Sequence, residues 1–362
     1  MRLAVIGAGA GVFGMHRPAI EALGLELVGL ADVNEEPART RARELGTSYF
    51  QNHRVMLSAV TPDVVAIVAP HPFHAPLAID ALRMGAHVLV EKPIAVHVAE
   101  ADAMIATASE VDRLLAVSLQ HRTRAEVRTA RKLISDGRLG EIQRVDVVAT
   151  WTRSRAYYAQ AGWRGTWRGE GGGVLMNQAP HTLDVLCHLV GQPSRVVAWN
   201  RTLYHAIETE DTAQAMFEWP NGALGTLLVS TAMAGEPERI EIVGTRGALL
   251  LHGGALSFSE LTTDLREFLR VEPNPYARPV FEPRAVTLEP NGGNHQAIYA
   301  NFISAIEGGA ALVADGAQAR MSLELANALI SSSHTGQAVE LPLDRAAYAR
   351  LLEELQVAQV VA

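Results

Sequence analysis

The sequence contains 362 residues, of which 48% are hydrophobic and 19% are charged, with 31 Lys and Arg against 39 Asp and Glu. A net charge of −8 argues against a protein that grips nucleic acid, because such proteins carry a basic stripe and none is visible here. No apolar run approaches the roughly 20 residues that span a bilayer. The length predicts two domains, each large enough to bury a core.

The single cysteine, Cys187, cannot form an internal disulfide, which fits a reducing compartment. Met1 leads directly into an apolar strand over residues 3–6, so no basic export signal precedes that strand. We therefore expect a soluble, cytoplasmic protein without a membrane or nucleic-acid partner.

Up to about residue 120, short apolar runs alternate with segments of helical periodicity. The predicted strands are Leu3–Ile6, Leu25–Ala31, Val64–Ala69, His87–Val90 and Leu114–Val117. The predicted helices are Val12–Leu23, Pro37–Leu45, His74–Met84 and Val98–Ser109. Apolar strands separated by helices are typical of a parallel sheet covered on both faces. The fold class is therefore α/β, beginning with a doubly wound parallel sheet of the Rossmann type.

After a predicted helix over 125–136, closed by Gly137, the pattern changes to consecutive strands. They are predicted at Ile142–Trp151, Arg195–Tyr204, Thr212–Trp219, Ala223–Thr231, Arg239–Val243 and Ala248–Leu251. Further helices are predicted at Pro180–Val190, His295–Ile306 and Ala317–Ser333. Tight turns such as Asn221-Gly222 indicate a mainly antiparallel sheet, hence an α+β second domain. Residues 152–172 and 262–293 resist assignment, and long loops of this kind are often functional or serve as interface arms.

The first strand runs into a glycine loop, Gly7-Ala8-Gly9-Ala10-Gly11-Val12-Phe13-Gly14. Glycines let the chain turn tightly and let its N–H groups approach a pyrophosphate, while the next helix points its positive end at the same anion. Because this loop lies between a strand and a helix, it predicts a dinucleotide site that includes Gly7, Gly9, Gly11, Val12 and Phe13.

The second strand ends at Asp32, 25 residues after Gly7. A carboxylate at this place accepts hydrogen bonds from both ribose hydroxyls of adenosine and repels a 2′-phosphate, which favours NAD over NADP. Arg39 and Arg41 could serve a phosphate, so NADP stays open as the less favoured cofactor.

Two more segments end parallel strands, Ala69-Pro70-His71-Pro72-Phe73-His74 and Glu91-Lys92-Pro93. Open α/β sheets bind ligands at the carboxyl ends of their strands, so Pro70, His74, Glu91 and Lys92 are expected beside the cofactor. The spacing of His71 and His74 is compatible with a metal, but no further carboxylate or cysteine lies near them in the sequence. We therefore expect no metal site.

These motifs resemble those of the glucose–fructose oxidoreductase, inositol dehydrogenase and rhizopine-catabolism (Gfo/Idh/MocA) family. The resemblance continues through Gln120-His121-Arg122, Gly171-Gly172-Gly173, Asn177, His181 and Asp184 to the tail segment 336–342. It implies an NAD-binding Rossmann domain over residues 1–120. It also implies a substrate-binding and oligomerisation domain over 121–362, whose open sheet carries the contacts of a homodimer or homotetramer.

Most members of that family oxidise or reduce a secondary alcohol on a sugar, inositol or related ring. Hydride transfer from such a carbon requires removal of the hydroxyl proton and stabilisation of the developing alkoxide. The resemblance assigns stabilisation to Lys92 and acid–base catalysis to His181, whose imidazole titrates near neutral pH. Asn177 stands where many members have Asp and cannot take up a proton, which leaves His181 as the sole base. Asp184 either orients His181 or lies on the helix surface.

The loop before Gly171 offers aromatic and arginine side chains, the types that hold the faces and hydroxyls of a sugar. We expect Tyr158, Trp163 and Arg164 to bind substrate, together with Asn177 and with Gln120 and Arg122 from the domain junction. The alternative for each is a place in the loop core or in a subunit interface.

The sequence therefore predicts an NAD-dependent dehydrogenase acting on a sugar, glycoside or cyclitol. One alternative is a glycoside hydrolase or lyase that oxidises C3 transiently with NAD, with Tyr157 or Tyr158 as an extra acid or base. A second is a non-catalytic, dinucleotide-binding sensor, which the presence of both Lys92 and His181 disfavours.

Overall fold

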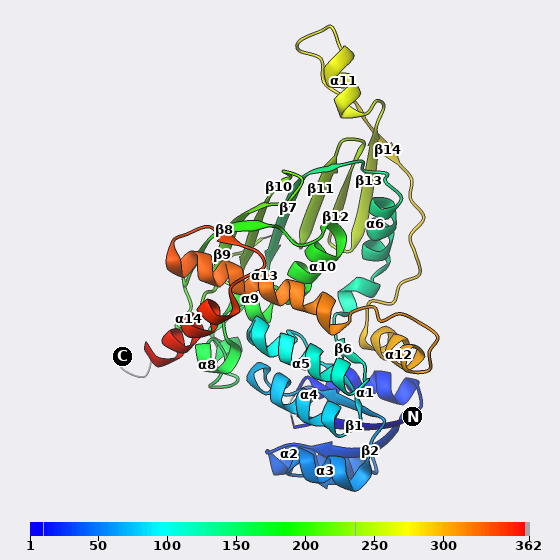
Figure 1. Ribbon diagram of the computed structural model, residues 1–362, viewed down its shortest axis with the longest axis vertical. Coiled ribbons are helices and arrows are strands. Elements are labelled where there is room, and N and C mark those ends of the chain that lie inside the picture. The colour runs from blue at the N-terminus through cyan, green and yellow to red at the C-terminus, as the bar shows by residue number, and fades with distance from the viewer. Residues whose placement is uncertain (10, 236, 359–362) are drawn as a thin grey trace.

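The computed structural model describes residues 1–358 except Ala10 and Glu236, and it contains two sheets (Figure 1). The N-terminal part forms a parallel sheet between layers of helices, and the remainder builds a larger sheet beside it. One buried apolar cluster runs through both parts, because α5 (Val98–Glu110) of the first packs against α13 (Gly316–Thr335) of the second. None of the described helices combines the length and apolar character that crossing a bilayer requires.

The parallel sheet has six strands in the order β3-β2-β1-β4-β5-β6. Their bounds are β1 Arg2–Ile6, β2 Glu26–Ala31, β3 Tyr49–Phe50, β4 Val64–Ile67, β5 His87–Val90 and β6 Leu115–Val117. The other helices of this part are α1 Phe13–Ala22, α2 Glu35–Glu44, α3 His53–Val60 and α4 His74–Arg83. The predicted doubly wound sheet is confirmed, and only β3 and α3 were not predicted. The strand order reverses between β1 and β4, which places a ligand crevice at the carboxyl ends of these two strands.

The second sheet has nine strands in the order β14-β13-β12-β11-β7-β10-β9-β8-β15. Their bounds are β7 Ile142–Thr150, β8 Arg195–Arg201, β9 Thr212–Glu218, β10 Leu224–Ser230, β11 Arg239–Gly244, β12 Gly247–His252, β13 Ala255–Leu261, β14 Phe281–Arg284 and β15 Val339–Glu340. Neighbouring strands are antiparallel except β7 and β10, which run parallel. The sheet is therefore mixed and mainly antiparallel, as predicted.

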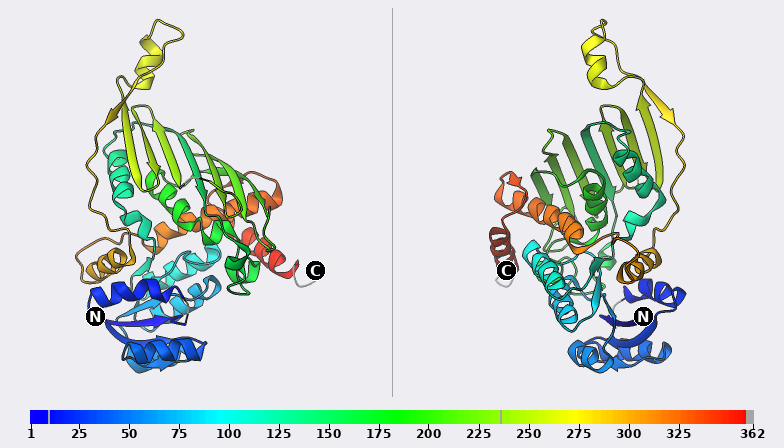
Figure 2. Two further views of the ribbon diagram at one scale, coloured as in Figure 1. Left: turned by 180° about the vertical axis from the view of Figure 1, so that it is seen from behind. Right: turned by 45° about the vertical axis from the view of Figure 1, so that its right-hand side comes forward.

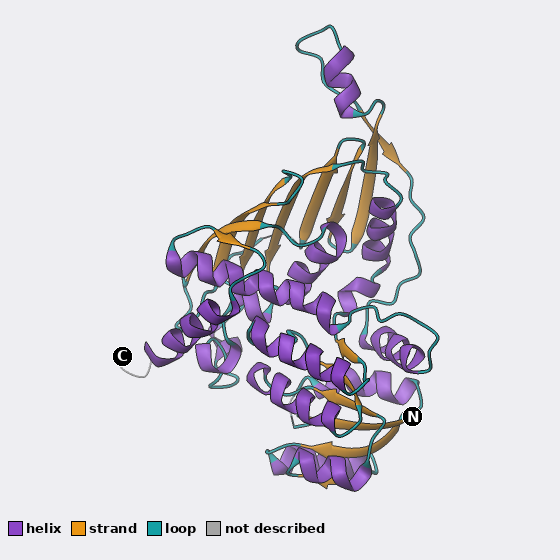
Figure 3. Ribbon diagram, in the orientation of Figure 1, coloured by secondary structure: helices purple, strands orange, loops and turns teal. Residues whose placement is uncertain are grey.

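Helices cover one face of this second sheet (Figure 3). They are α6 Ala125–Ser135, α9 Val174–Asn177, α10 Pro180–Val190 and α13. The opposite face carries exposed Trp199, Met216 and Leu224. Shorter elements and the terminal helix complete the chain: η1 His71–Phe73, η2 Gln120–Thr123, α7 Arg155–Tyr158, α8 Trp167–Glu170, α12 His295–Ile306 and α14 Arg345–Ala358.

The segment 262–293 forms an arm that carries α11 (Leu265–Val271) and β14 (Figure 2). It projects from the edge of the large sheet, where β14 pairs with β13, and then returns along the molecule to α12. Several of its apolar side chains are exposed, with Leu269 at 72% and Tyr276 at 89%.

A buried ion pair joins η2 to α10. The Arg122 guanidinium donates to both carboxylate oxygens of Asp184 (2.6 and 2.8 Å), and both side chains are at most 1% exposed. Burial raises the pKa of Asp184, although the Arg122 guanidinium opposes the shift. Such a pair costs desolvation energy, but the loss of one partner leaves a bare buried charge, which costs more.

We expect Arg122→Met to lower the free energy of unfolding by about 3–5 kcal/mol, because Asp184 is then unpaired. The double variant Arg122→Met/Asp184→Leu should recover most of that loss. Urea unfolding followed by circular dichroism measures both changes. Equal losses in the single and double variants would contradict a stabilising charge pair.

Glu210 holds the start of α9, the helix that leads into the candidate site. Its Oε1 accepts the N–H groups of Gly173 (2.8 Å) and Leu175 (3.0 Å), while its buried Oε2 has no partner among the described residues. Burial raises the pKa of Glu210 to about 7, although the backbone donors oppose the shift. Gly173 is required here, because a Cβ on it would lie 1.8 Å from the Glu210 carbonyl oxygen.

A raised pKa in the folded state means that folding favours protonated Glu210, so this contribution to stability is present below pH 4.5 and disappears as pH rises through 7. The side chain of Glu210→Gln cannot ionise. We therefore expect the free energy of unfolding of this variant, relative to that of the parent, to be about 3 kcal/mol higher at pH 8 than at pH 5. Urea unfolding at both pH values measures this difference, with exposed Glu110→Gln as the matched control. A difference that does not change with pH would refute the protonated state.

Candidate active site

The glycine loop after β1 lies directly against the end of β4. Gly7 has a φ of +93°, and a Cβ on it would lie 2.5 Å from the Ala69 nitrogen. Only glycine therefore lets these two strand ends approach so closely. Their junction is the point where the strand order reverses, which is where open α/β sheets bind their ligands.

Asp32 at the end of β2 is fixed beside this loop. One carboxylate oxygen accepts the Gly9 N–H (2.7 Å) and the other accepts the Asn34 N–H (2.7 Å). Each oxygen keeps a further lone pair for a hydroxyl donor. The Arg41 guanidinium, also considered for a phosphate, reaches back to the Ala8 carbonyl oxygen.

Helix α1 begins at Phe13 with Val12 as its N-cap, and it has no side-chain cap and no acidic residue in its first turn. A Cβ on Gly11 would meet nothing within 4 Å, so the loop has open space in front of it. Ala10 lies outside the described residues. A free helix N-terminus behind an open glycine loop fits a dinucleotide pyrophosphate.

His74 ties together the loops that follow β4 and β5. Its ring nitrogens lie 2.8 Å from the Pro93 carbonyl oxygen and 2.7 Å from that of Ala69, and the side chain is completely buried. Burial lowers the pKa of His74, although the two carbonyl oxygens oppose the shift. His74 therefore holds together the two loops that border the cofactor crevice.

Glu91 is buried between α1 and α12. Its Oε1 accepts from His16 Nε2 (3.0 Å) and His295 Nε2 (3.3 Å), and its Oε2 accepts the Lys92 N–H (3.2 Å). The Tyr299 hydroxyl donates to His16 Nδ1 (3.0 Å). Burial alone would raise the pKa of Glu91, but donation from both histidines holds it well below the usual range. These hydrogen bonds hold Glu91 in place, and they thereby fix the chain directly before Lys92.

Lys92 and His181 line one pocket of about 710 Å³ between the two parts of the molecule. The lining also includes Asn177, Gln178, His121, Arg124, Glu126, Trp151, Arg153, Tyr157, Glu238 and Asn291. The two predicted catalytic residues, 89 positions apart in the chain, are thus brought together.

The Lys92 ammonium donates to the Asn177 carbonyl oxygen (2.9 Å). Burial lowers the pKa of Lys92, while the carboxylates of Glu91 and Glu170 raise it. The amine therefore lies in a largely desolvated place, where the charge of its protonated form acts strongly on a neighbouring oxygen.

His181 stacks on His121, with ring centroids 4.0 Å apart and an angle of 18° between the planes. Burial holds the pKa of His181 well below 6.5, and the charges of His121 and Lys92 lower it further. Its Nδ1 is buried without a partner in the described part of the chain. His181 is therefore a neutral imidazole at physiological pH, able to accept a proton.

Asn177 belongs to a polar network on the pocket wall. Its amide donates to Glu170, and its Oδ1 accepts from the Tyr157 hydroxyl (3.2 Å), which in turn accepts from Arg164 (2.8 Å). Burial raises the pKa of Glu170. A carboxylate, that of Glu170, therefore stands beside Asn177.

Two expectations are wrong. Arg122 does not face the pocket, because its guanidinium is buried against Asp184, Gln318 and the Val313 carbonyl oxygen. Asp184 neither orients His181 nor lies on the helix surface, because it is fully buried in that ion pair.

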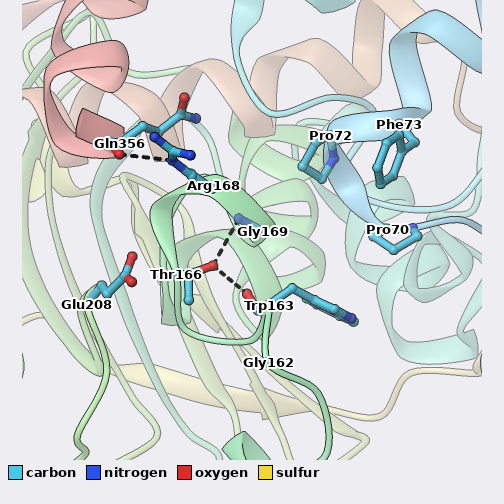
Figure 4. A pocket seen from close by; sticks show the side chains of 10 residues that line it. All are labelled: Pro70, Pro72, Phe73, Gly162, Trp163, Thr166, Arg168, Gly169, Glu208 and Gln356. Atoms are coloured by element: carbon cyan, nitrogen blue, oxygen red, sulfur yellow. Dashed lines mark hydrogen bonds between the residues drawn. The ribbon is translucent and has the colours of Figure 1, made fainter. Parts of the chain in front are cut away.

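Four further predicted residues do not line this pocket: Gln120, Tyr158, Trp163 and Arg164. Gln120 has a buried Oε1 with no partner among the described residues. The Tyr158 hydroxyl bonds Thr231 Oγ1 (2.8 Å). Trp163 lines a second pocket of about 570 Å³, where its indole points toward Pro70, with Phe73 nearby (Figure 4).

Sequence reasoning missed His121, Arg124, Trp151 and Glu238 as pocket residues. The signal for His121 was available, because it lies within the Gln120-His121-Arg122 motif. Trp151 and Glu238 stand at the ends of strands, and only the sheet register shows that these ends lie side by side, since Arg239 pairs with Val148.

Residues 1–119 match the oxidoreductase family with an NAD-binding Rossmann fold, and residues 127–250 match the Gfo/Idh/MocA C-terminal domain. The chain is 27% identical over 364 residues to the D-glucoside 3-dehydrogenase of Escherichia coli (strain K12), covering 94% of this chain and 97% of the relative. It is 25% identical over 328 residues to the 1,5-anhydro-D-fructose reductase of Ensifer adhaerens, covering 89% and 93%.

The WlbA dehydrogenase from Bordetella pertussis, crystallised with NADH and UDP-GlcNAcA, is 31% identical and superposes with a TM-score of 0.81. The match covers 95% of this chain and 99% of that chain. With both family matches and a relative of this similarity over almost its whole length, the chain belongs to the Gfo/Idh/MocA oxidoreductase family and begins with that family's NAD-binding Rossmann fold.

Proposed function

We propose that this protein is an NAD-dependent dehydrogenase that transfers a hydride between nicotinamide and a secondary hydroxyl-bearing carbon of a sugar, glycoside or cyclitol. The observation that carries the proposal is the single pocket lined by Lys92 and His181 beside the cofactor crevice. The relatives described above are dehydrogenases and a reductase of sugars, which supports the same chemistry.

The residues of the crevice fit NAD. Gly7, Gly9, Gly11, Val12 and Phe13 would hold the pyrophosphate at the N-terminus of α1. Asp32 would accept the adenosine ribose hydroxyls, and the loops carrying Pro70, His74 and Glu91 would border the nicotinamide riboside. Bound NAD⁺ supplies the acceptor for the hydride that leaves the substrate carbon.

The remaining chemistry falls to two side chains. Lys92 donates a hydrogen bond to the reacting oxygen and stabilises the negative charge that develops on it. Neutral His181 accepts the hydroxyl proton, so the proton goes to the imidazole as the carbon loses its hydride. Asn177, Tyr157 and Arg164, linked by hydrogen bonds, orient the neighbouring hydroxyls.

The division of labour follows the two sheets. We assign cofactor binding to residues 1–120, and substrate binding and subunit contacts to residues 121–362. A lone, buried Cys187 agrees with a cytoplasmic location.

We expect His181→Ala and Lys92→Met each to lower kcat/KM for sugar oxidation by about 10²–10⁴-fold, since each removes a group that acts on the proton or the alkoxide. The assay follows NADH absorbance with a panel of pyranosides and cyclitols. Matched controls are His188→Gln on the same helix and exposed Lys132→Met, which should keep parental rates.

Wild-type rates in His181→Ala or Lys92→Met would contradict the assigned roles. Release of 4-nitrophenol from a nitrophenyl glycoside without net NADH would replace the dehydrogenase by the hydrolase or lyase. Binding of NAD with no turnover of any sugar in the panel would favour the sensor.

The open face of the large sheet suits contacts between subunits. Trp199 on β8 and Met216 on β9 are more than half exposed, and Leu224 on β10 continues the apolar surface. Contiguous exposed apolar side chains on a flat sheet typically mark an interface. We propose that two copies pack through this face in a homodimer or homotetramer.

We expect Trp199→Lys/Met216→Lys to reduce the assembly to smaller species, because buried ammonium groups would oppose the contact. Light scattering coupled to gel filtration gives the mass. The matched control is Met15→Lys, which alters an exposed methionine on α1. An unchanged mass in the double variant would place the interface elsewhere.

A further inference from the structure

The pocket that holds Lys92 and His181 extends well past these two residues. Its other end is formed by the ends of β7 and β11 and by the turn after β12, with Trp151, Glu238 and Gly253 in the wall. Its volume of about 710 Å³ lies in the upper part of the range that is usual for drug-sized ligands. There is room for a unit beyond the ring that reacts.

Glu126 is the hydrogen-bond acceptor of this distal region that a ligand would contact. It lies in the first turn of α6 and lines the pocket, yet it is only 8% exposed. No hydrogen bond or ion pair joins its carboxylate to another residue in the described part of the chain. Because its oxygens are not among the described buried polar atoms that lack a partner, the carboxylate opens into the pocket, where the donors of a ligand can reach it.

The other charged groups of the pocket already have partners. The Arg124 guanidinium bonds His121 Nε2 (2.6 Å) and lies 3.7 Å from the Glu238 carboxylate. The Arg153 guanidinium stacks over the Tyr157 ring at 5.2 Å. Among the charged side chains that line the pocket in the described part of the chain, Glu126 is therefore the one without a protein partner, and it can accept the hydrogen-bond donors of a ligand.

We propose that the substrate is a neutral glycoside whose second, hydroxyl-bearing unit donates to Glu126 and packs against Trp151. This rests on the proposed function, because the first ring is oxidised between Lys92 and His181. Carboxylates accept sugar hydroxyls well, and an aromatic face covers the C–H surface of a pyranose. A phosphate ester or nucleotide diphosphate placed against Glu126 would set an anion against a carboxylate that has no cationic partner, and both classes are disfavoured at this subsite.

The test compares kcat/KM for methyl β-glucoside, neutral glucose disaccharides, glucose 6-phosphate and UDP-glucose. We expect a disaccharide to exceed the methyl glucoside by about tenfold, the worth of one charge-assisted hydrogen bond. Glu126→Leu should lower that ratio by about tenfold, and Glu126→Gln, which keeps an acceptor oxygen, by about threefold. Exposed Glu110→Leu is the matched control.

A second readout does not depend on turnover. Because Glu126 has no protein partner among the described residues, Glu126→Gln should leave the thermal midpoint of the substrate-free protein unchanged, and a lowered midpoint would show that the carboxylate has a structural role. A ratio unchanged by Glu126→Leu, or a preference for a phosphorylated substrate, overturns the subsite while the dehydrogenase stands. Failure of every sugar to reduce NAD⁺ overturns both.

Discussion

The hydrogen bond from Lys92 Nζ to the Asn177 carbonyl oxygen joins the two parts of the molecule at the pocket where we propose that the chemistry takes place. Lys92 follows β5 of the parallel sheet, and Asn177 ends α9, which packs on the other sheet. The ammonium is buried, so its position depends on the charge around it, with Glu91 on one side and Glu170 on the other. A shift between the two parts would break this bond and separate Lys92 from His181, so the proposed activity depends on the docking of the two sheets.

Glu91 connects the neighbourhood of Lys92 to segments that are distant in the sequence. Its carboxylate is held by His16 from α1 and His295 from α12, and His16 is held in turn by Tyr299. Helix α1 also presents its N-terminus to the cofactor crevice, and α12 begins where the projecting arm ends. One carboxylate therefore ties the cofactor loop, the proposed catalytic lysine and the end of the arm into one unit, which explains why these segments, far apart in sequence, must fold together.

Much of this arrangement could be predicted from the sequence, because it depends on local patterns. The helices Pro180–Val190 and His295–Ile306 have the predicted bounds, since their apolar periodicity and their caps are local. The motif Glu91-Lys92-Pro93 was predicted at a strand end for the same reason. The helix His53–Val60 was overlooked although its cap, Asn52, was visible in the sequence.

Long-range partners could not be predicted. Arg122 has a polar motif around it, and nothing local shows that Asp184, 62 positions later, neutralises it in the core. Glu170 likewise gives no sign in the sequence that it accepts from Asn177. In both cases burial decides the role of the side chain, because a buried charge takes a partner wherever the fold supplies one. An arginine or a carboxylate inside a functional motif therefore predicts proximity to a site better than it predicts contact with a ligand.

The charges of the pocket set one requirement for both directions of the proposed reaction. Lys92 disfavours a second cation on His181, whose pKa burial has already lowered. Oxidation of an alcohol would leave its proton on the imidazole beside Lys92, and reduction of a ketone would start from that same protonated state. The cost of placing two positive charges together therefore enters both directions equally. A substrate oxygen that carries negative charge between the two side chains offsets this cost, so the electrostatics favour the alkoxide-like oxygen of the transition state over either end state.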